Sequence, residues 1–362
     1  MTWEPERLDD QTLLAEADQG GMLPVVASAA AQVRTAHRDA SEAGVARLTR
    51  DGRPRAIVVA GMGAAALAGD ILAAVCGYGA PLPIITVRSG RLPGWVGATD
   101  LVMAVSSSGR TAETLAAATE AVRRGASLLV VSAPESPLQA IATQASALFV
   151  PVRAHGPSRA NLWGLAVPLL VAAGSLGIAQ ADDDLFEGTA RALEEMAHRC
   201  RPTSESFINP GKSLAMELAD SVPVLWGTSP LTAVAAHRLA LQLNENAKYP
   251  AIWGEIPEAG HNQLAMLDGP LAQRDIFADT AERTLRLVVL READDRPQEL
   301  LRMAQDRGVP VSELTAEGVT PLERLATLIE LGDYASAYLA LGYGTDPTPV
   351  TSITELKARL SQ

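Results

Sequence analysis

The sequence predicts an α/β protein with two doubly wound parallel-sheet domains, an N-terminal helical segment and a C-terminal helix. Short, continuous apolar runs recur along the chain, as in strands buried on both faces of a sheet, and helical patterns lie between most of them. The same alternation appears in both halves of the 362 residues. Alternating strands and helices with short connections favour parallel sheets covered by helices on both faces.

The first half is expected to hold an N-terminal helical segment and then a four-stranded domain. Residues 9–45 show helical spacing of apolar side chains. The strands are predicted, in chain order, at 56–60, 83–87, 101–105 and 127–131. We therefore place the helical segment at 1–50 and the first domain at 51–180.

The second half repeats this plan after a polar, helical stretch at 182–210. Strands are predicted at 222–227, 285–290 and 309–314, and helices at 231–246, 297–307 and 322–341. The expected parts are a helical linker at 181–210, a second domain at 211–345 and a C-terminal helix at 346–362. In such folds, ligands bind at the carboxyl ends of the strands.

The composition favours a soluble cytoplasmic protein. Hydrophobic residues make up 48% of the chain, enough for a full core, and a net charge of −12 without a basic run argues against a nucleic-acid partner. We expect no signal peptide and no membrane partner, although residues 162–179 approach membrane-spanning length. The two cysteines, Cys76 and Cys200, suggest no disulfide framework.

The most informative stretch is SSSGRT at 106–111, between a predicted strand and a predicted helix. A helix N-terminus carries unpaired N–H groups and a partial positive charge, so a loop rich in hydroxyls there can cradle a phosphate. A capping Ser or Thr would favour a similar composition. Four hydroxyls in six positions, with a glycine and an arginine, exceed what capping needs.

Other motifs are less informative. GMGAAA at 61–66 fits a dinucleotide fingerprint, in which the next strand should end in an acidic residue. That strand ends here in Arg88, and an arginine at this position suits at most a phosphorylated dinucleotide. GKS at 211–213 lacks the glycine and the preceding strand of a P-loop. The histidines show no ligand spacing, so we expect no metal, and no nucleophile elbow is present.

The segment 244–262 combines a carboxylate, a lysine and a histidine after a predicted buried helix. A solvated helix end would explain any one of these residues. Together they are suitable for moving protons between carbon and oxygen. The chain has only three lysines, Lys212, Lys248 and Lys357, in an arginine-rich composition, which suggests that each is kept for its compact ammonium.

These motifs together resemble the bifunctional phosphoglucose/phosphomannose isomerases of archaea and bacteria, which contain two sugar-isomerase (SIS) domains. In the first half, GMGAAALAGD at 61–70, Arg88 with Leu92-Pro93, SSSGRTAET at 106–114 and PSRA at 157–160 resemble the family's GMGGSAIGGD, R-x-Y-x-L-P, S-x-SGNTEET and PRA elements. In the second half, the similar stretches are NENAK at 244–248, PEAGHN at 257–262 and the segments 332–340, 346–347 and 353–357.

The resemblance implies a flavodoxin-like SIS fold for each domain. It also implies an isomerase that interconverts glucose 6-phosphate, mannose 6-phosphate or both with fructose 6-phosphate through a cis-enediol, as a homodimer without a cofactor. Glu245 would carry the proton, Arg159 would stabilise the enediolate, His261 would assist ring opening from the partner subunit, and Lys357 would complete the pocket. The implied substrate contacts are Gly63, Ala64, Ala65, Ser106, Ser108, Arg110 and Thr111.

The chain departs from the family pattern around the substrate. Ala64-Ala65 replaces Gly-Ser, Arg110 replaces an asparagine, and Ser158 replaces a proline. Methyl groups at 64 and 65 could crowd a backbone that must approach the substrate closely. A non-catalytic SIS-domain protein that binds a sugar phosphate therefore remains as the alternative.

Overall fold

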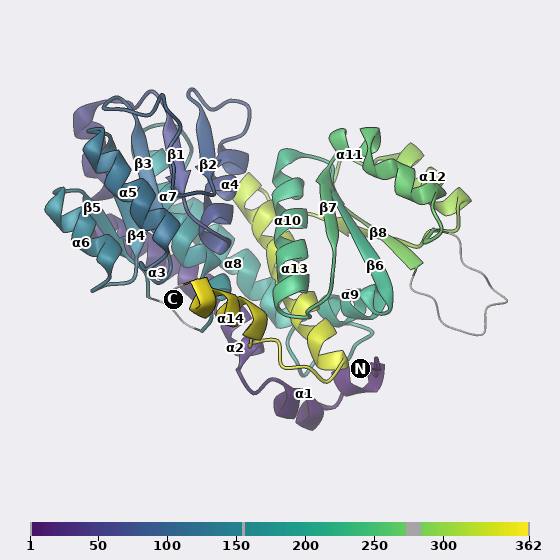
Figure 1. The fold of residues 1–362 in the computed structure, drawn as a ribbon. Coiled ribbons are helices and arrows are strands. Elements are labelled where there is room, and N and C mark those ends of the chain that lie inside the picture. The colour runs from purple at the N-terminus through teal and green to yellow at the C-terminus, as the bar shows by residue number, and fades with distance from the viewer. Residues whose placement is uncertain (1, 154–155, 273–283, 361–362) are drawn as a thin grey trace. The chain divides into compact units, whose positions relative to one another are not determined.

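The computed structural model describes residues 2–153, 156–272 and 284–360, and the chain forms two compact units (Figure 1). The first unit is Ser28–Arg191, and the second combines Met1–Ala27 with Ala192–Gln362. Both contain a parallel sheet covered by helices, so the predicted α/β class is confirmed. The finer five-part division of the chain stays a prediction.

The first unit is built on a five-stranded parallel sheet of order β2-β1-β3-β4-β5. Its strands are β1 (Ile57–Ala60), β2 (Ile84–Val87), β3 (Leu101–Ser106), β4 (Ser127–Ser132) and β5 (Leu148–Pro151). The first four lie where the apolar runs predict them. Ser106 pairs in register with Ser132, so β3 and β4 end together at the carboxyl edge.

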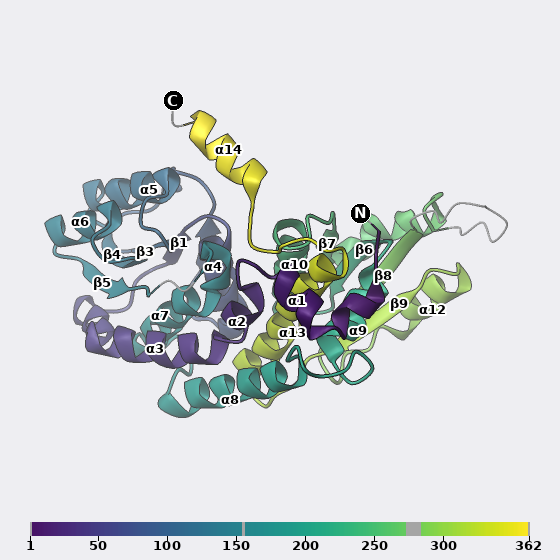
Figure 2. The ribbon, with the colours of Figure 1, turned by 90° about the horizontal axis from the view of Figure 1, so that it is seen from below.

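Helices cover both faces of this sheet. Its helices are α3 (Ala29–Glu42), α4 (Ala64–Cys76), α5 (Ala112–Arg123), α6 (Pro137–Gln144) and α7 (Leu162–Ser175), with the short helical segment η2 (Val45–Asp51). α5 and α6 pack on one face, where Val58, Val102 and Leu128 point. α4 and α7 pack on the other face, and Figure 2 shows α7 between the sheet and α3.

A glycine allows α4 to approach the sheet closely. A Cβ on Gly69 would lie 2.8 Å from Val59 Cβ and 2.6 Å from Thr86 Oγ1. Real side chains do not tolerate such distances. The alanines of α4 are mostly buried for the same reason, because small side chains suit a helix held this near to the strands.

The second unit contains a four-stranded parallel sheet of order β7-β6-β8-β9. Its strands are β6 (Ser221–Gly227), β7 (Ile252–Glu255), β8 (Thr284–Arg291) and β9 (Val311–Thr315). In chain order this arrangement matches the first four strands of the first sheet. The related order is consistent with the repeated plan that the sequence predicts.

The second unit also contains helices from the C-terminal half of the chain. These are α9 (Pro210–Leu218), α10 (Pro230–Glu245), α11 (Glu258–His261), η4 (Gln263–Asp268), α12 (Gln298–Asp306), α13 (Pro321–Gly342) and α14 (Thr351–Leu360). α10 packs on the sheet and against α13. On the other face, side chains of α11, η4 and α12 form a core with Trp226, Leu287 and Val289.

The N-terminal segment is not one helical stretch as expected from residues 9–45. It forms η1 (Pro5–Leu8), α1 (Gln11–Ala17) and α2 (Met22–Val26) before α3. The break follows from Gly21, whose φ of 66° leaves the helical region, and the Asp18 carboxylate then caps α2. The predicted polar helix at 182–210 is shorter, α8 (Asp183–Arg199), and contains the point where the chain passes between the units.

Candidate functional site

The hydroxyl-rich loop connects the end of β3 with the start of α5. Ser106 is buried; its Oγ lies 3.0 Å from Thr111 Oγ1 and accepts a hydrogen bond from Gly109 N at 3.1 Å. Gly109 has a φ of 64°, and a Cβ there would lie 2.2 Å from Ser136 Oγ. Only glycine fits this turn, which gathers the loop's hydroxyls beside the helix N-terminus.

The two helices that follow β1 and β3 begin without a side-chain cap among the described residues. Neither Thr111 at the start of α5 nor Gly63 at the start of α4 caps its helix with a side-chain hydrogen bond. The first N–H groups of a helix have no intrahelical partner and carry partial positive charge. Because β1 and β3 are neighbouring parallel strands, both N-termini lie at the same edge of the sheet. This edge is suited to a phosphate.

The remaining predicted phosphate contacts differ in exposure. Ser108 and Arg110 are exposed, and the backbone N–H of Arg110 donates to Ser108 Oγ at 3.3 Å. Gly63 is exposed and Ala64 is half-buried, whereas Ala65 is only 5% exposed. Since the Ala65 methyl group packs in the core, Gly63 and Ala64 are the accessible residues of these three.

Arg159 lies on a short turn, η3 (Ser158–Ala160), and is buried. The Gln32 amide donates to the carbonyl oxygen of the last residue of this turn at 2.9 Å. Asn161, which follows it, donates to Ser107 Oγ at 3.5 Å and so links the turn to the hydroxyl-rich loop. The sequence analysis identified neither Gln32 nor Asn161 as part of the site. Asn161 was detectable as the neighbour of the PSRA motif, whereas Gln32 carries no local signal.

Glu245 is the last residue of α10 and is half-buried. The next residue, Asn246, is fully buried and donates to Ser336 Oγ on α13 at 2.9 Å. Two turns earlier, Arg238 forms a bidentate ion pair with Asp333 of α13, at 2.9 and 2.7 Å. These contacts fix the end of α10 and hence the backbone of Glu245.

The polar contacts between α10 and α13 form a buried seam. It consists of Arg238 and Gln242 on α10, of Asn246 directly after α10, and of Glu330, Asp333 and Ser336 on α13. Among the described residues, neither amide atom of Gln242 nor Glu330 Oε1 has a hydrogen-bond partner. Burial, followed by the neighbouring Asp333 carboxylate, raises the pKa of Glu330 well above its usual value, with Arg238 opposing the shift.

Lys248 connects the segment after Glu245 with the segment before α14. Its Nζ donates to the carbonyl oxygens of Asn246, Asp346 and Pro347 at 3.0 to 3.1 Å. Lys357 lies on α14 and is exposed. Lys248 therefore tethers the chain that leads to Lys357, a role that its NENAK motif alone does not reveal.

His261 is the last residue of α11 and is exposed. Asn262, next to it, donates to the backbone oxygen and to the carboxylate of Glu258 at 3.2 and 3.1 Å. The ring of His261 is thus presented on a short helix whose end is held by a local amide. Glu245, His261 and Lys357 belong to the second unit, and Arg159 and the hydroxyl-rich loop belong to the first.

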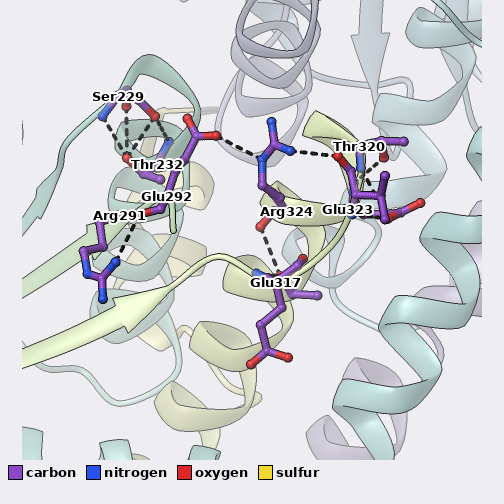
Figure 3. Close-up of polar contacts among 10 residues, drawn as sticks. Ser229, Thr232, Arg291, Glu292, Glu317, Thr320, Glu323 and Arg324 are labelled. Atoms are coloured by element: carbon purple, nitrogen blue, oxygen red, sulfur yellow. Dashed lines mark hydrogen bonds and ion pairs between the residues drawn. The ribbon is translucent and has the colours of Figure 1, made fainter. Parts of the chain in front are cut away.

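At the carboxyl edge of the second sheet, side chains satisfy polar groups at the start of α10 and after β8 (Figure 3), whereas α12 begins without a side-chain cap in the described part of the chain. Ser229 caps α10 through a reciprocal pair of hydrogen bonds with Thr232. At the end of β8, the Glu292 carboxylate lies 3.0 Å from Arg324 Nε, and its backbone oxygen accepts from Arg291. Among the described residues, the helices that follow the first strand of each sheet therefore differ: α10 is capped by a side chain and α4 is not.

Within residues 2–153, 156–272 and 284–360, no group of three or more His, Cys, Asp or Glu side chains is placed to hold a metal ion. In the same ranges, no helix has the length and apolar character to cross a membrane. The cysteines Cys76 and Cys200 are free thiols.

Comparison with known proteins gives consistent results. The family model described as "Bacterial phospho-glucose isomerase C-terminal SIS domain" matches residues 207–360. A "Bifunctional phosphoglucose/phosphomannose isomerase" of Caldicellulosiruptor bescii is 31% identical over 312 residues, which cover 84% of this chain and 89% of that protein. A protein of the same name from Aquifex aeolicus is 29% identical over 285 residues, 77% of this chain and 82% of that protein.

Among solved structures, a hypothetical protein from Thermus thermophilus has a similar fold. The match has a TM-score of 0.70 at 17% identity and covers 99% of this chain and 94% of that one. At this identity the likeness concerns the fold alone.

Proposed function

This chain belongs to the bifunctional phosphoglucose/phosphomannose isomerase family, and from this premise we propose that it interconverts glucose 6-phosphate, mannose 6-phosphate or both with fructose 6-phosphate. Two observations, one in each unit, carry the proposal: a sheet edge suited to a phosphate, and a carboxylate held at a fixed helix end. The first is the loop at 106–111, and the second is Glu245.

The phosphate group is held at the edge of the first sheet in this proposal. Ser106, Ser108 and Thr111 offer hydroxyls, and the uncapped N-termini of α4 and α5 offer backbone N–H groups. Arg110 adds a guanidinium that can strengthen the binding of a dianion. Ala65 is buried, so the loss of the family's serine there removes a hydroxyl without placing a methyl group in the site.

Glu245 performs the proton transfer in this proposal. Its carboxylate removes the proton from C2 of the open-chain aldose, and the electron pair forms the enediolate with its negative charge on O1. A proton then moves from O2 to O1, and Glu245 returns its proton to C1 to give the ketose. Arg159 stabilises the charge where it develops, because a fixed cation favours the enediolate over the uncharged substrate.

His261 and Lys357 are the two remaining residues of the proposed catalytic site. His261 assists opening of the sugar ring, for which an imidazole near neutral pH is well suited. Lys357 provides a further cation at the pocket. We also propose that the protein acts in the cytoplasm as a homodimer in which His261 reaches the partner's site; its exposure on α11 is compatible with that role.

A coupled assay for fructose 6-phosphate, with glucose 6-phosphate and mannose 6-phosphate supplied separately, tests the proposal. Glu245→Gln should abolish turnover and leave sugar-phosphate binding nearly unchanged, since the amide keeps the shape and cannot take a proton. Glu299→Gln, an exposed carboxylate on α12, is the matched control and should retain full activity.

Two results would redirect the assignment. Saturable binding of a sugar phosphate without turnover in the wild-type protein would support the alternative, a non-catalytic SIS-domain binding protein. Loss of binding in step with activity in Glu245→Gln would remove Glu245 from the role of base.

A further inference from the structure

The turn that carries Arg159 is held by a side chain of α3. Gln32 lies in the first turn of α3 and is 7% exposed, and its Nε2 donates to the carbonyl oxygen of Ala160 at 2.9 Å. Ala160 is the last residue of η3 and the neighbour of Arg159. α3 packs against α7, which begins directly after this segment, and Figure 2 shows the two helices side by side. The contact therefore joins the turn to a packed part of the first unit.

The amide nitrogen of Gln32 serves two acceptors. Besides the Ala160 oxygen, Ser28 Oγ accepts from Nε2 at 3.1 Å. Because a carbonyl oxygen only accepts, the bond to Ala160 fixes which end of the amide is the nitrogen. The opposite atom, Oε1, is buried without a partner among the described residues, which costs about 1–3 kcal/mol. An apolar side chain would avoid that cost, so the contacts of the nitrogen account for an amide at this position.

The turn itself lies at the sheet edge that is suited to a phosphate. Directly after η3, Asn161 Nδ2 lies 3.3 Å from the carbonyl oxygen of Pro157 and 3.5 Å from Ser107 Oγ in the hydroxyl-rich loop. η3 also packs against α4, whose N-terminus belongs to the same edge. Arg159 is 5% exposed, so its side chain has little freedom of its own, and the guanidinium moves with the backbone of the turn.

The position of this guanidinium matters for the rate. A fixed cation lowers the barrier only where it stands beside the charge that develops in the transition state. A displacement of about 1 Å, caused by a change far from the reacting atoms, can cost about a hundredfold in rate. A side chain that fixes the turn can therefore control the rate without touching the substrate.

We propose that Gln32 is a positioning residue for the isomerisation: by holding the Ala160 carbonyl group, it keeps the Arg159 guanidinium where the enediolate charge forms. The inference rests on the proposed function, and in particular on the role of Arg159. It gives Gln32 no contact with the sugar phosphate, so binding of the phosphate should not depend on Gln32.

Steady-state kinetics with glucose 6-phosphate and mannose 6-phosphate test the proposal. Gln32→Met keeps the length of the side chain and removes the donor; it should lower kcat by about 10- to 100-fold and leave the KM nearly unchanged. Calorimetric titration with glucitol 6-phosphate, which has the phosphate but no carbonyl group, should give wild-type affinity. Ser28→Ala is the matched control: it removes the other acceptor of the same nitrogen and should retain the wild-type kcat.

The pH profile of Gln32→Glu separates positioning from a general loss of structure. The protonated carboxyl group can donate to the Ala160 oxygen, and the ionised group cannot. Burial raises the pKa of such a group toward neutral pH. The kcat of Gln32→Glu, relative to the wild type, should therefore rise as the pH is lowered, whereas the ratio for Gln32→Met should stay constant.

An Arg159→Ala background shows whether Gln32 acts through Arg159. Gln32→Met should cause no further loss of kcat there, because no guanidinium is left to position. An equal further loss, or an unchanged kcat in folded Gln32→Met, would overturn this inference alone. A wild-type protein without turnover would overturn the proposed function and this inference with it. If Gln32→Met fails to fold or Arg159→Ala is inactive, a flat profile for Gln32→Glu overturns the inference instead.

Discussion

Lys212 and Lys248 show at the residue scale why a lysine persists in an arginine-rich chain. Lys212 is 1% exposed, and its Nζ donates to the Asp9 carboxylate and to the carbonyl oxygens of Pro202 and Ser204, at 2.8 to 3.2 Å. Lys248 makes three similar contacts. A compact ammonium can serve three acceptors around one point, which a planar guanidinium cannot. The compositional argument therefore identified structural lysines as readily as Lys357, for which a role in the pocket is proposed.

Glu330 should make stability depend on pH. Its pKa is raised above the ordinary value of 4.5 by burial, so the folded protein holds a proton that the unfolded chain releases. Stability is then fully present below pH 4.5 and falls as pH rises toward the folded-state pKa, by about 1.4 kcal/mol per pH unit from this group. Glu330→Gln, which needs no proton, should raise the midpoint of thermal unfolding more at pH 8 than at pH 5.

Glu299→Gln serves as the control for that experiment, because the Glu299 carboxylate is exposed and should give no such dependence. An equal change in the Glu330→Gln midpoint at both pH values would show that Glu330 is ionised in the folded protein.

The two kinds of helix N-terminus should respond differently to loss of a hydroxyl. Ser108→Ala, beside the uncapped α5, should raise the KM for the sugar phosphate about tenfold and leave stability unchanged, because an exposed hydroxyl is lost from a charged ligand. Ser229→Ala, which removes the cap of α10, should lower stability by about 1 kcal/mol and leave the KM unchanged. Steady-state kinetics measure the KM of both variants, and denaturant unfolding measures their stability. The reverse pattern would move the phosphate site to the second sheet.

The packing of α10 on α13 depends on a buried ion pair. Asp333→Asn leaves the charge of Arg238 uncompensated in the interior and should lower stability by about 3–5 kcal/mol. Asp268→Asn breaks an exposed pair with Arg307 at a similar distance and should change little. Urea unfolding of the two variants makes the comparison. Equal effects would show that the seam does not hold α10.

Elements buried on both faces could be predicted from the sequence, whereas two of the four edge strands, β5 and β7, could not. β3 is a continuous apolar run that every window detects. β5 and β7 have four residues each, β5 ends in a proline, and β7 contains a glycine and exposes Ile252 and Trp253. Their strand conformation comes from pairing with β4 and β6, which is tertiary information.

In the candidate site, contiguous motifs could be predicted from the sequence, whereas contacts between distant residues could not. The sequence predicted the loop at 106–111 and Glu245 because their motifs are contiguous. Gln32 and Ser336 lie 128 and 90 residues from the atoms that they contact in Ala160 and Asn246. Single-sequence spacing has no access to such pairs, so the residues that support the site became visible only in the folded chain.

The sequence predicted both sheets of the whole molecule and missed the path of its N-terminus. Residues Met1–Ala27 join the compact unit that contains the C-terminal half. The backbone N–H of Glu4 donates to the carbonyl oxygen of Gly342, and the Asp9 carboxylate binds Lys212. No local pattern encodes this return of the chain, because each contact joins residues more than two hundred positions apart.

Assembly of the whole molecule can be tested through His261. Glu245→Gln and His261→Ala should each have little activity. If His261 serves the partner's site, a mixed dimer contains one site with both native residues, so an equal mixture after subunit exchange should recover about a quarter of wild-type turnover. Each variant alone, taken through the same exchange, is the control. If His261 serves its own subunit, every site lacks one residue and the mixture stays inactive. Recovered turnover would therefore establish a homodimer and place His261 across its interface in one measurement.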